Sequence, residues 1–313
     1  MSVIHLRPQN ALAGAFFITV AVFAMSLQDA LVKLSSSQLP LWQLFTLRAA
    51  MAAVPFAVIG FLGRTAVRPF TPWVMLRAFL LCGMYLSLYA VTPYLELATI
   101  AAAFYTGPLF TTLFSVLLIA EPASPRRWFA NVLGLAGVML VVRPGTAAFD
   151  WLTLVPIAGA VCYALAAVIT RARCATAHPV SLALGLNVAL FATGVVLAAV
   201  QFALPVSGGE HSTSFLFGPW RAIDASTWSV IAALAALFIV IGLGLAKAYQ
   251  TAPPAVVATF DYAYLLFAAM WGYVFFNEIP DAASVSGIAI IIVAGLIAAM
   301  PSRRLDPALN PDG

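Results

Sequence analysis

The sequence predicts an all-α integral membrane protein with ten transmembrane helices, arranged as two inverted five-helix repeats. Three observations predict this fold class: the composition, a series of apolar segments, and an internal repeat. Of the 313 residues, 63% are hydrophobic and only 8% are charged, against about 25% charged in a soluble domain. The longest polar interval, between Leu204 and Ser226, is too short for a soluble catalytic or ligand-binding domain. The protein therefore works inside the bilayer.

Ten apolar segments predict the helices, because a membrane crossing takes about 20 predominantly apolar residues. The expected helices span residues 12–33, 41–62, 72–95, 97–120, 127–143, 151–171, 179–204, 226–247, 254–276 and 283–300. Prolines stand at or near several of these starts, where a missing backbone N–H costs nothing. They are Pro40, Pro72, Pro125, Pro179, Pro253 and Pro254.

The basic residues predict the orientation, because cytoplasmic loops carry an excess of Lys and Arg. With ten helices, one side holds Arg7, Arg64, Arg68, Arg77, Arg126, Arg127, Arg171, Arg173, Lys247, Arg303 and Arg304. The other side holds Lys33, Arg143 and Arg221. This asymmetry predicts a multi-pass protein of the inner (plasma) membrane with both termini in the cytoplasm. No basic cluster suits a nucleic acid, so we expect none as partner.

An internal repeat divides the chain into two halves. Placing Glu121 on Glu278, an offset of 157 residues, also places Tyr105 on Tyr262. Because five helices is an odd number, the second half enters the membrane from the opposite side, and such inverted halves suit alternating access. We therefore expect a first five-helix repeat in residues 1–145, a second in 150–302, and a short cytoplasmic tail in 303–313.

Several motifs resemble a known family. Arg48 lies early in the second helix, Thr106-Gly107-Pro108-Leu109 precedes Glu121, and Gly134 and Gly137 follow in the next helix. Together with the span count, they resemble the EamA-type branch of the drug/metabolite transporter superfamily, over about residues 10 to 300. The resemblance implies a ten-helix secondary carrier of small metabolites, with the cavity between the two halves.

Two shorter segments point to a subgroup. Residues 29–33 (Asp-Ala-Leu-Val-Lys) and 260–262 (Phe-Asp-Tyr) are similar to a bacterial group that includes carriers of S-adenosylmethionine, riboflavin and amino-acid-derived metallophores. One difference stands out, since the second half has Leu265 where the first has Pro108. A proline-kinked helix is therefore expected only in the first half.

Asp29 and Arg48 are the first candidate site residues, because a charged side chain inside a membrane needs a partner or a water-filled cavity. They are expected at similar depth near the outer ends of helices 1 and 2. Either they form a gate or a clamp for substrate charge, or they are a static ion pair that fixes two helices. Lys33, four residues after Asp29, is an alternative local partner for it.

Asp261 and Asn187 are the candidates in the second half. Asp261 has no basic residue within a turn, so it is a candidate for taking up and releasing a proton during the transport cycle. The alternative is a structural carboxyl group, hydrogen-bonded to Asn187 or protonated. Asn187 lies at nearly the place in the second half that Arg48 has in the first, and is a candidate to line the cavity.

The tyrosines are candidate cavity-lining residues, because each supplies a ring surface and a hydroxyl group. Tyr85 and Tyr89 are expected on one face of helix 3, and Tyr105 and Tyr262 at repeat-related positions. Packing and the interfacial aromatic belt are the alternative explanation. The carboxylates Glu96, Glu121 and Glu278 are expected near helix ends, the last two fixing loops by meeting Arg126, Arg127 or loop backbone.

Three classes of function fit the fold to different degrees. A secondary transporter fits best, moving a small polar or amphipathic metabolite, amino-acid-derived or vitamin-like, along an ion or solute gradient, with protons as a candidate coupling ion. A flippase of lipids or their headgroups could use the same scaffold. An enzyme is not expected, because the chain has no GxxxxGK[ST], HExxH or GxSxG motif and only three histidines. The three cysteines lack CxxC spacing, so no disulfide, metal or cofactor is expected. Membrane lipid surrounds the protein, and the oligomeric state is left open, a homodimer included.

Overall fold

The computed structural model of the protein describes residues 11–62, 68–147, 149–203, 213–252 and 254–300, and all regular structure within these ranges is helical. Four residues of the charge count, Arg7, Arg64, Arg303 and Arg304, lie outside the described ranges, as does the expected tail 303–313.

Every one of the ten predicted apolar segments is helical. The helices of the first half are α1 (Ala11–Ser35), α2 (Leu41–Leu62), α3 (Pro72–Val91), α4 (Leu97–Phe104), α5 (Gly107–Ile119) and α6 (Pro125–Val142). Those of the second are the short 3-10 helix η1 (Trp151–Thr153), α7 (Leu154–Arg173), α8 (Pro179–Ala203), α9 (Thr213–Phe217), α10 (Ala225–Thr251), α11 (Pro254–Asp261), α12 (Ala263–Phe276) and α13 (Ala282–Ala299). The short helix α9 was not expected.

Local sequence explains where several helices begin. Proline is the first residue of α3, α6, α8 and α11, as the sequence predicts. Three helices also have an N-cap side chain that accepts a hydrogen bond from a backbone N–H of the first turn: Ser124 for α6, Asp224 for α10 and Asp281 for α13.

Seven segments of the described residues are long and apolar enough to cross a membrane. They are Leu12–Ser35, Pro72–Val91, Leu97–Ile119, Trp151–Arg173, Pro179–Ala203, Ala225–Leu245 and Ala282–Ala299. Not among them are α2, α6, whose first turn contains a pair of arginines, and the α11–α12 segment, whose two pieces have 8 and 14 residues. The structure thus confirms an all-helical, multi-pass membrane protein, and ten spans remain a prediction.

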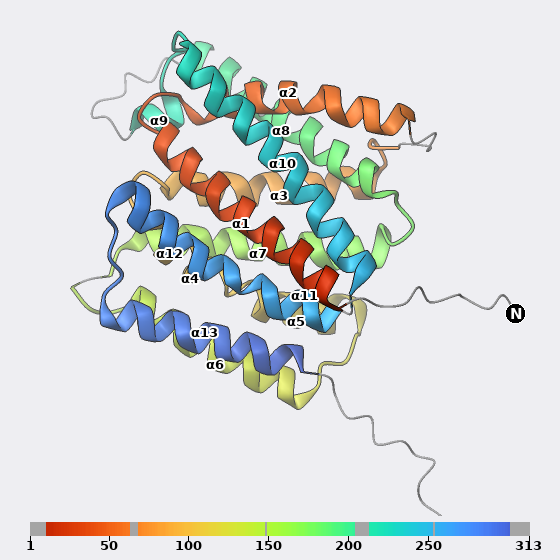
Figure 1. Ribbon diagram of the computed structural model, residues 1–313, viewed down its shortest axis with the longest axis vertical. Helices are drawn as coiled ribbons and strands as arrows, with labels where there is room; N and C mark the ends of the chain where they lie inside the picture. The colour runs from red at the N-terminus through yellow and green to blue at the C-terminus, as the bar shows by residue number, and fades with distance from the viewer. Residues whose placement is uncertain (1–10, 63–67, 148, 204–212, 253, 301–313) are drawn as a thin grey trace, which may run out of the picture.

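The helices pack in a regular arrangement. In Figure 1, α6 and α13 lie together at one edge, α2, α8 and α10 lie towards the other, and α1, α3, α7 and α12 lie between them. The contacts pair α1 with α10 and α12, α3 with α7 and α8, α2 with α8 and α10, and α5 with α7. At the α6–α13 contact the backbones come close, because a Cβ on Gly137 would lie 2.7 Å from the carbonyl oxygen of Gly287.

Both halves contain an interrupted helix. In the first half Tyr105 and Thr106 separate α4 from α5, and in the second half Tyr262 separates α11 from α12. At each place the hydrogen bonds shorten to a three-residue spacing, from Thr106 N to Ala103 O and from Leu265 N to Tyr262 O. A proline-kinked helix was expected only in the first half, and the second helix is interrupted at Tyr262 without a proline, where the hydrogen-bond spacing changes.

The two interrupted helices also end alike. Ala120 follows α5 and Asn277 follows α12, and both have left-handed backbone angles, with φ of 53° and 54°. In each case the next residue, Glu121 or Glu278, donates its N–H to a carbonyl six residues earlier. This ending fixes the two repeat-related glutamates at the last turn of their helices.

Candidate functional site

One end of the bundle is held by an ion pair between Lys33, at the end of α1, and Glu278, after α12. The side chains are only 12% and 13% exposed. Lys33 Nζ also donates to the carbonyl oxygen of Leu95 at 2.6 Å, and Glu278 Oε2 accepts from the N–H of Leu97 at 2.9 Å. Lys33 is therefore not the local partner of Asp29. Of the partners expected for Glu278, a backbone group is present, whereas Lys33 takes the place of Arg126 or Arg127.

The opposite helix ends carry a second ion pair, between Arg171 at the end of α7 and Glu121 after α5. It is much more open to solvent, with 67% of the Arg171 side chain and 33% of the Glu121 side chain exposed. Arg126, an expected partner of Glu121, donates instead to the backbone carbonyl of Met300. If the predicted repeat holds, α1 corresponds to α7 and α5 to α12, and the two pairs occupy related places.

Asp29 is held between tyrosines of both halves. Its Oδ1 accepts a hydrogen bond from the Tyr89 hydroxyl at 3.1 Å, and its Oδ2 accepts one from the Tyr264 hydroxyl at 2.6 Å. Gln28 Nε2 donates to the same Tyr89 hydroxyl at 3.1 Å. The carboxylate thus joins α1 to α3 and α12, and not to Arg48. Tyr264, which the sequence analysis did not name as a site residue, was detectable as a tyrosine three residues after Asp261.

Arg48 is buried among aromatic rings and does not pair with Asp29. Its side chain is 1% exposed, and its guanidinium carbon lies 5.6 Å from the ring centres of Phe45 and Tyr85 and 5.1 Å from that of Phe238. Both terminal nitrogens, Nη1 and Nη2, lack a hydrogen-bond partner among the described residues. The expected ion pair is therefore absent from this conformation.

The predicted tyrosine pair of α3 links the surroundings of Arg48 to those of Asp29. The rings of Tyr85 and Tyr89 lie 5.6 Å apart, on one helix face as expected. Tyr85 faces the Arg48 guanidinium, and Tyr89 donates to Asp29. The two charged candidates are thus connected through aromatic side chains, without direct contact.

The repeat-related tyrosines meet at the interruptions of their helices. The ring centres of Tyr105 and Tyr262 lie 5.1 Å apart, and those of Tyr105 and Tyr264 lie 6.1 Å apart. The Tyr105 hydroxyl donates to the backbone carbonyl of Asp261 at 2.9 Å. Asp261 therefore lies at the contact between the two interrupted helices, next to the tyrosines.

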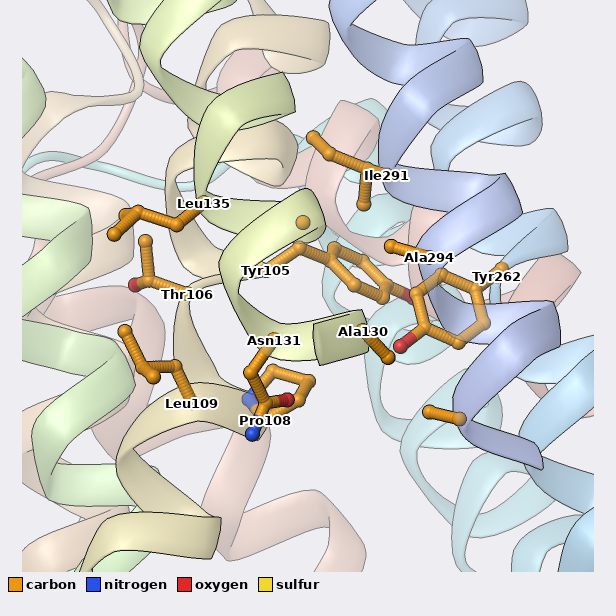
Figure 2. A pocket seen from close by; sticks show the side chains of 12 residues that line it. Tyr105, Thr106, Pro108, Leu109, Ala130, Asn131, Leu135, Tyr262, Ile291 and Ala294 are labelled. Carbon is orange, nitrogen blue, oxygen red and sulfur yellow. The ribbon is translucent and has the colours of Figure 1, made fainter. Parts of the chain in front are cut away.

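Two cavities flank this tyrosine layer. The first is small, with a volume of about 20 Å³, and Figure 2 shows it between Asn131 of α6, Tyr105 and Tyr262. Asn131 Nδ2 is buried and has no hydrogen-bond partner among the described residues. The second, of about 10 Å³, is lined by Asp29 and by residues from the Lys33 end of α3 and α4. The cavities lie towards opposite ends of the bundle.

Asn187 has a different position from the one expected. It is buried between α8 and α2, where its Nδ2 donates to the backbone carbonyl of Ala49 at 2.9 Å. This bond ties two helices together and gives the amide a structural partner, so Asn187 is not part of the tyrosine layer. It is not bonded to Asp261 either.

Metal ligands do not gather in the part of the chain that the structure describes. Within these residues no three His, Cys, Asp or Glu side chains are placed so as to hold a metal ion. Cys82, Cys162 and Cys174 are free thiols. The chemistry of the layer is therefore that of tyrosine hydroxyls, aromatic rings, two carboxyl groups and one guanidinium.

Comparison with known proteins connects this architecture to transport. Residues 12–143 match the EamA-like transporter family. A riboflavin transporter of Rhizobium johnstonii is 26% identical over 308 residues, which cover 93% of this chain and 92% of the relative. An S-adenosylmethionine uptake transporter of Rickettsia prowazekii is 26% identical over 296 residues, covering 91% and 92% of the two chains.

Two further likenesses cover nearly the whole chain. A pseudopaline exporter of Pseudomonas aeruginosa is 23% identical over 285 residues, which cover 90% of this chain and 94% of the relative. A solved crystal structure superposes with a TM-score of 0.62 at 20% identity, covers 92% of this chain and 96% of its own, and shows a shared fold. The first half of the chain is thus similar to the EamA-like transporter family, and relatives that match nearly its whole length are named as transporters of small metabolites, which points to a transporter and not to an enzyme.

Proposed function

We propose that the protein is a secondary transporter that moves a small polar or amphipathic metabolite by alternating access between two inverted five-helix halves. The observation that carries this proposal is the layer in which Asp29 is held by tyrosines of both halves, with a cavity on either side. A site between two halves, flanked by separate cavities, is the arrangement that alternating access needs.

The packing of the helices supports ten spans and an inverted repeat, with halves in residues 1–145 and 150–302. In the repeat, α1 corresponds to α7, α2 to α8, α3 to α10 and α5 to α12. The α1–α10 contact then has its counterpart in α7–α3, the α1–α12 contact in α7–α5, and the α2–α10 contact in α8–α3. All of these contacts occur. The α6–α13 and α2–α8 contacts map onto themselves. The α11–α12 segment corresponds to the α4–α5 span and α2 to α8, so both cross the membrane in this proposal.

The two ion pairs act as gates in this mechanism. Lys33–Glu278 closes one end and Arg171–Glu121 closes the other, and the difference in exposure supports a conformation that is closed more firmly at the Lys33 end. The distribution of basic residues makes the Lys33 end the outer one, in the inner membrane, with both termini in the cytoplasm.

The substrate binds in the tyrosine layer. Asp29, Tyr85, Tyr89, Tyr105 and Tyr262 provide its ring surfaces, hydroxyl groups and negative charge. The names of the relatives include a vitamin and an amino-acid derivative, which supports a vitamin-like or amino-acid-derived metabolite. Those names include both uptake and export, so the direction is not part of the proposal.

Asp261 couples transport to protons in this scheme. It lies where the interrupted helices touch, beside Tyr105, which donates to its backbone carbonyl. A carboxyl group at a contact that breaks and re-forms during each cycle meets different surroundings in the two states, and can take up a proton in one and release it in the other.

Solute exchange in proteoliposomes tests the proposal. Vesicles containing the protein are loaded with an unlabelled candidate metabolite, and uptake of the labelled compound is followed for riboflavin, S-adenosylmethionine and amino acids. The proposal predicts exchange of a soluble metabolite that Asp29→Asn reduces at least tenfold. Movement of headgroup-labelled lipid with no exchange of any soluble compound would instead establish the flippase alternative.

A further inference from the structure

Arg48 is a buried cation whose two terminal nitrogens have no hydrogen-bond partner among the described residues. Its side chain is 1% exposed, and Nη1 and Nη2 have no hydrogen-bond partner among the described residues. The guanidinium is a cation with five N–H donors and no acceptor. A buried charge without a partner is strongly unfavourable, so a residue of this kind indicates a missing counter-charge.

The surrounding rings satisfy only part of the guanidinium. Phe45, Tyr85 and Phe238 lie 5.1–5.6 Å from its central carbon, at distances typical of cation–π contacts. Such contacts use the charge of the group and leave its in-plane N–H donors free. The planar fork of those donors matches a carboxylate, which it binds through two parallel hydrogen bonds.

The chain itself does not provide that carboxylate in this conformation. Asp29, the expected partner, accepts its hydrogen bonds from Tyr89 and Tyr264. Elsewhere the chain supplies acceptors for a half-buried arginine, since Arg77 donates to the Thr170 hydroxyl at 2.8 Å and to a backbone carbonyl at 3.4 Å. The unused donors of Arg48 are therefore not a general feature of arginines in this fold.

The aromatic rings around Arg48 come from both halves of the chain. Phe45 and Tyr85 come from α2 and α3 of the first half, whereas Phe238 comes from α10 of the second half. Phe238 also packs edge-on against Phe56, with ring centres 6.0 Å apart. In the proposed transport cycle, access to the guanidinium therefore requires Phe238 to move away from it.

We propose that Arg48 is the subsite for a carboxylate group of the substrate, with Phe45, Tyr85 and Phe238 enclosing the planar part of the molecule that carries it. The inference rests on the proposed transport function, because it names the group that the substrate must have. A carboxylate fits the site better than a phosphate does, because it is planar and carries a single charge, which limits the cost of its removal from water.

Binding of benzoate and of its neutral isostere benzamide tests the subsite. The midpoint of thermal unfolding of the purified protein is measured at constant ionic strength with each compound, since a ligand of the folded state raises the midpoint. Benzoate is expected to raise the wild-type midpoint and benzamide to leave it unchanged. An equal response to both compounds in the wild type overturns the proposal.

Variants assign the response to Arg48. Arg48→Gln should weaken benzoate binding at least tenfold and should not lower the midpoint without ligand, because an unpaired buried charge is removed. Arg48→Lys keeps the charge without the fork and should bind benzoate with intermediate strength. Arg173→Gln is the matched control, because Arg173 is exposed and lies over the single ring of Trp73 at 4.8 Å, so its benzoate response should equal that of the wild type.

The same variants separate this inference from the proposed function. An Arg48→Gln protein that keeps the full benzoate response refutes the subsite, even if solute exchange is observed in proteoliposomes. If Arg48→Gln does not fold, the wild-type comparison and Arg48→Lys decide. Discrimination between benzoate and benzamide without any solute exchange would support the subsite and refute alternating access, because the binding assay requires no transport.

Discussion

Neutralising Glu278 should open the Lys33 end of the transporter. Glu278→Gln keeps the shape of the side chain and an acceptor for the Leu97 N–H, but leaves Lys33 without its counter-charge. Lys33 retains the carbonyl of Leu95 and the ring of Phe276, 5.0 Å from its nitrogen. The change therefore removes the charge pairing and little else.

The magnitude follows from burial. Removing one partner of a buried ion pair costs about 3–5 kcal/mol. Because the two side chains are 12% and 13% exposed and Lys33 keeps other contacts, we take about 2–3 kcal/mol as the loss in the closed state. At 1.4 kcal/mol for each factor of ten, the ratio of open to closed molecules should rise about 30- to 100-fold.

Cysteine labelling measures this opening. Ile100, 6% exposed on α4, lines the cavity beside Asp29, and Ile100→Cys in a chain without its three native cysteines reports access from the Lys33 end. The rate of reaction with a membrane-impermeant maleimide should rise with the open fraction, about 30- to 100-fold. A rise of less than about threefold would refute the gate, because it corresponds to less than 1 kcal/mol.

The repeat-related pair provides the control. Glu121→Gln removes a solvent-exposed pair with Arg171, and such pairs contribute about 0.2–1 kcal/mol. Glu121→Gln should therefore change access to its own end by no more than about fivefold. The double variant Lys33→Glu, Glu278→Lys exchanges the two charges and keeps an ion pair. Labelling at Ile100→Cys should then be nearly as slow as in the protein with the native pair.

Three further predictions concern coupling, packing and pH. Asp261→Asn should abolish uptake driven by a proton gradient and leave exchange measurable, and unchanged driven uptake would remove Asp261 from coupling. Gly137→Ala places a Cβ 2.7 Å from a backbone carbonyl of α13 and should cost about 1–3 kcal/mol, seen as a lower unfolding midpoint. Gly242→Ala, with nothing within 4 Å of the new Cβ, should not lower the midpoint. The Arg143 guanidinium, and then the α13 N–H that Asp281 caps, lower the pKa of Asp281 from 3.8 to about 2, so this carboxylate stabilises the fold above pH 4 and the effect is lost as the pH falls to 2. Asp281→Ala should therefore lower the midpoint at pH 7 and flatten its decline between pH 4 and 2, and parallel curves for variant and wild type would contradict this.

Helix positions could be predicted from the sequence because they depend on local signals. Apolar length and proline placement put each of the ten segments within a few residues of a helix. The repeat-related pair Tyr105 and Tyr262 was also visible, since the offset that aligns two glutamates aligns these tyrosines. The interruption at Tyr262 was missed because it was inferred from proline alone, whereas a change in hydrogen-bond spacing is sufficient.

Partners of the charged residues could not be predicted, because depth and sequence spacing do not fix the direction in which a side chain points. Lys33 lies four residues after Asp29, yet its partner is Glu278, which is 245 residues away. Asp29 and Arg48 were expected at the same depth, but tyrosines of α3 and α12 occupy the acceptors of Asp29. Only the packing of both halves brings these groups together.

Ligand-induced stabilisation of the wild type and of Asp29→Asn, measured side by side, tests the central claim most directly. The ligands are riboflavin, S-adenosylmethionine, amino acids, nucleosides and lipids. The tyrosine layer predicts that a soluble metabolite raises the wild-type midpoint and that Asp29→Asn weakens its binding at least tenfold, which removes about 1.4 kcal/mol of stabilisation at high ligand concentration. Equal stabilisation of both proteins, or stabilisation by lipids alone, would contradict a substrate site at Asp29.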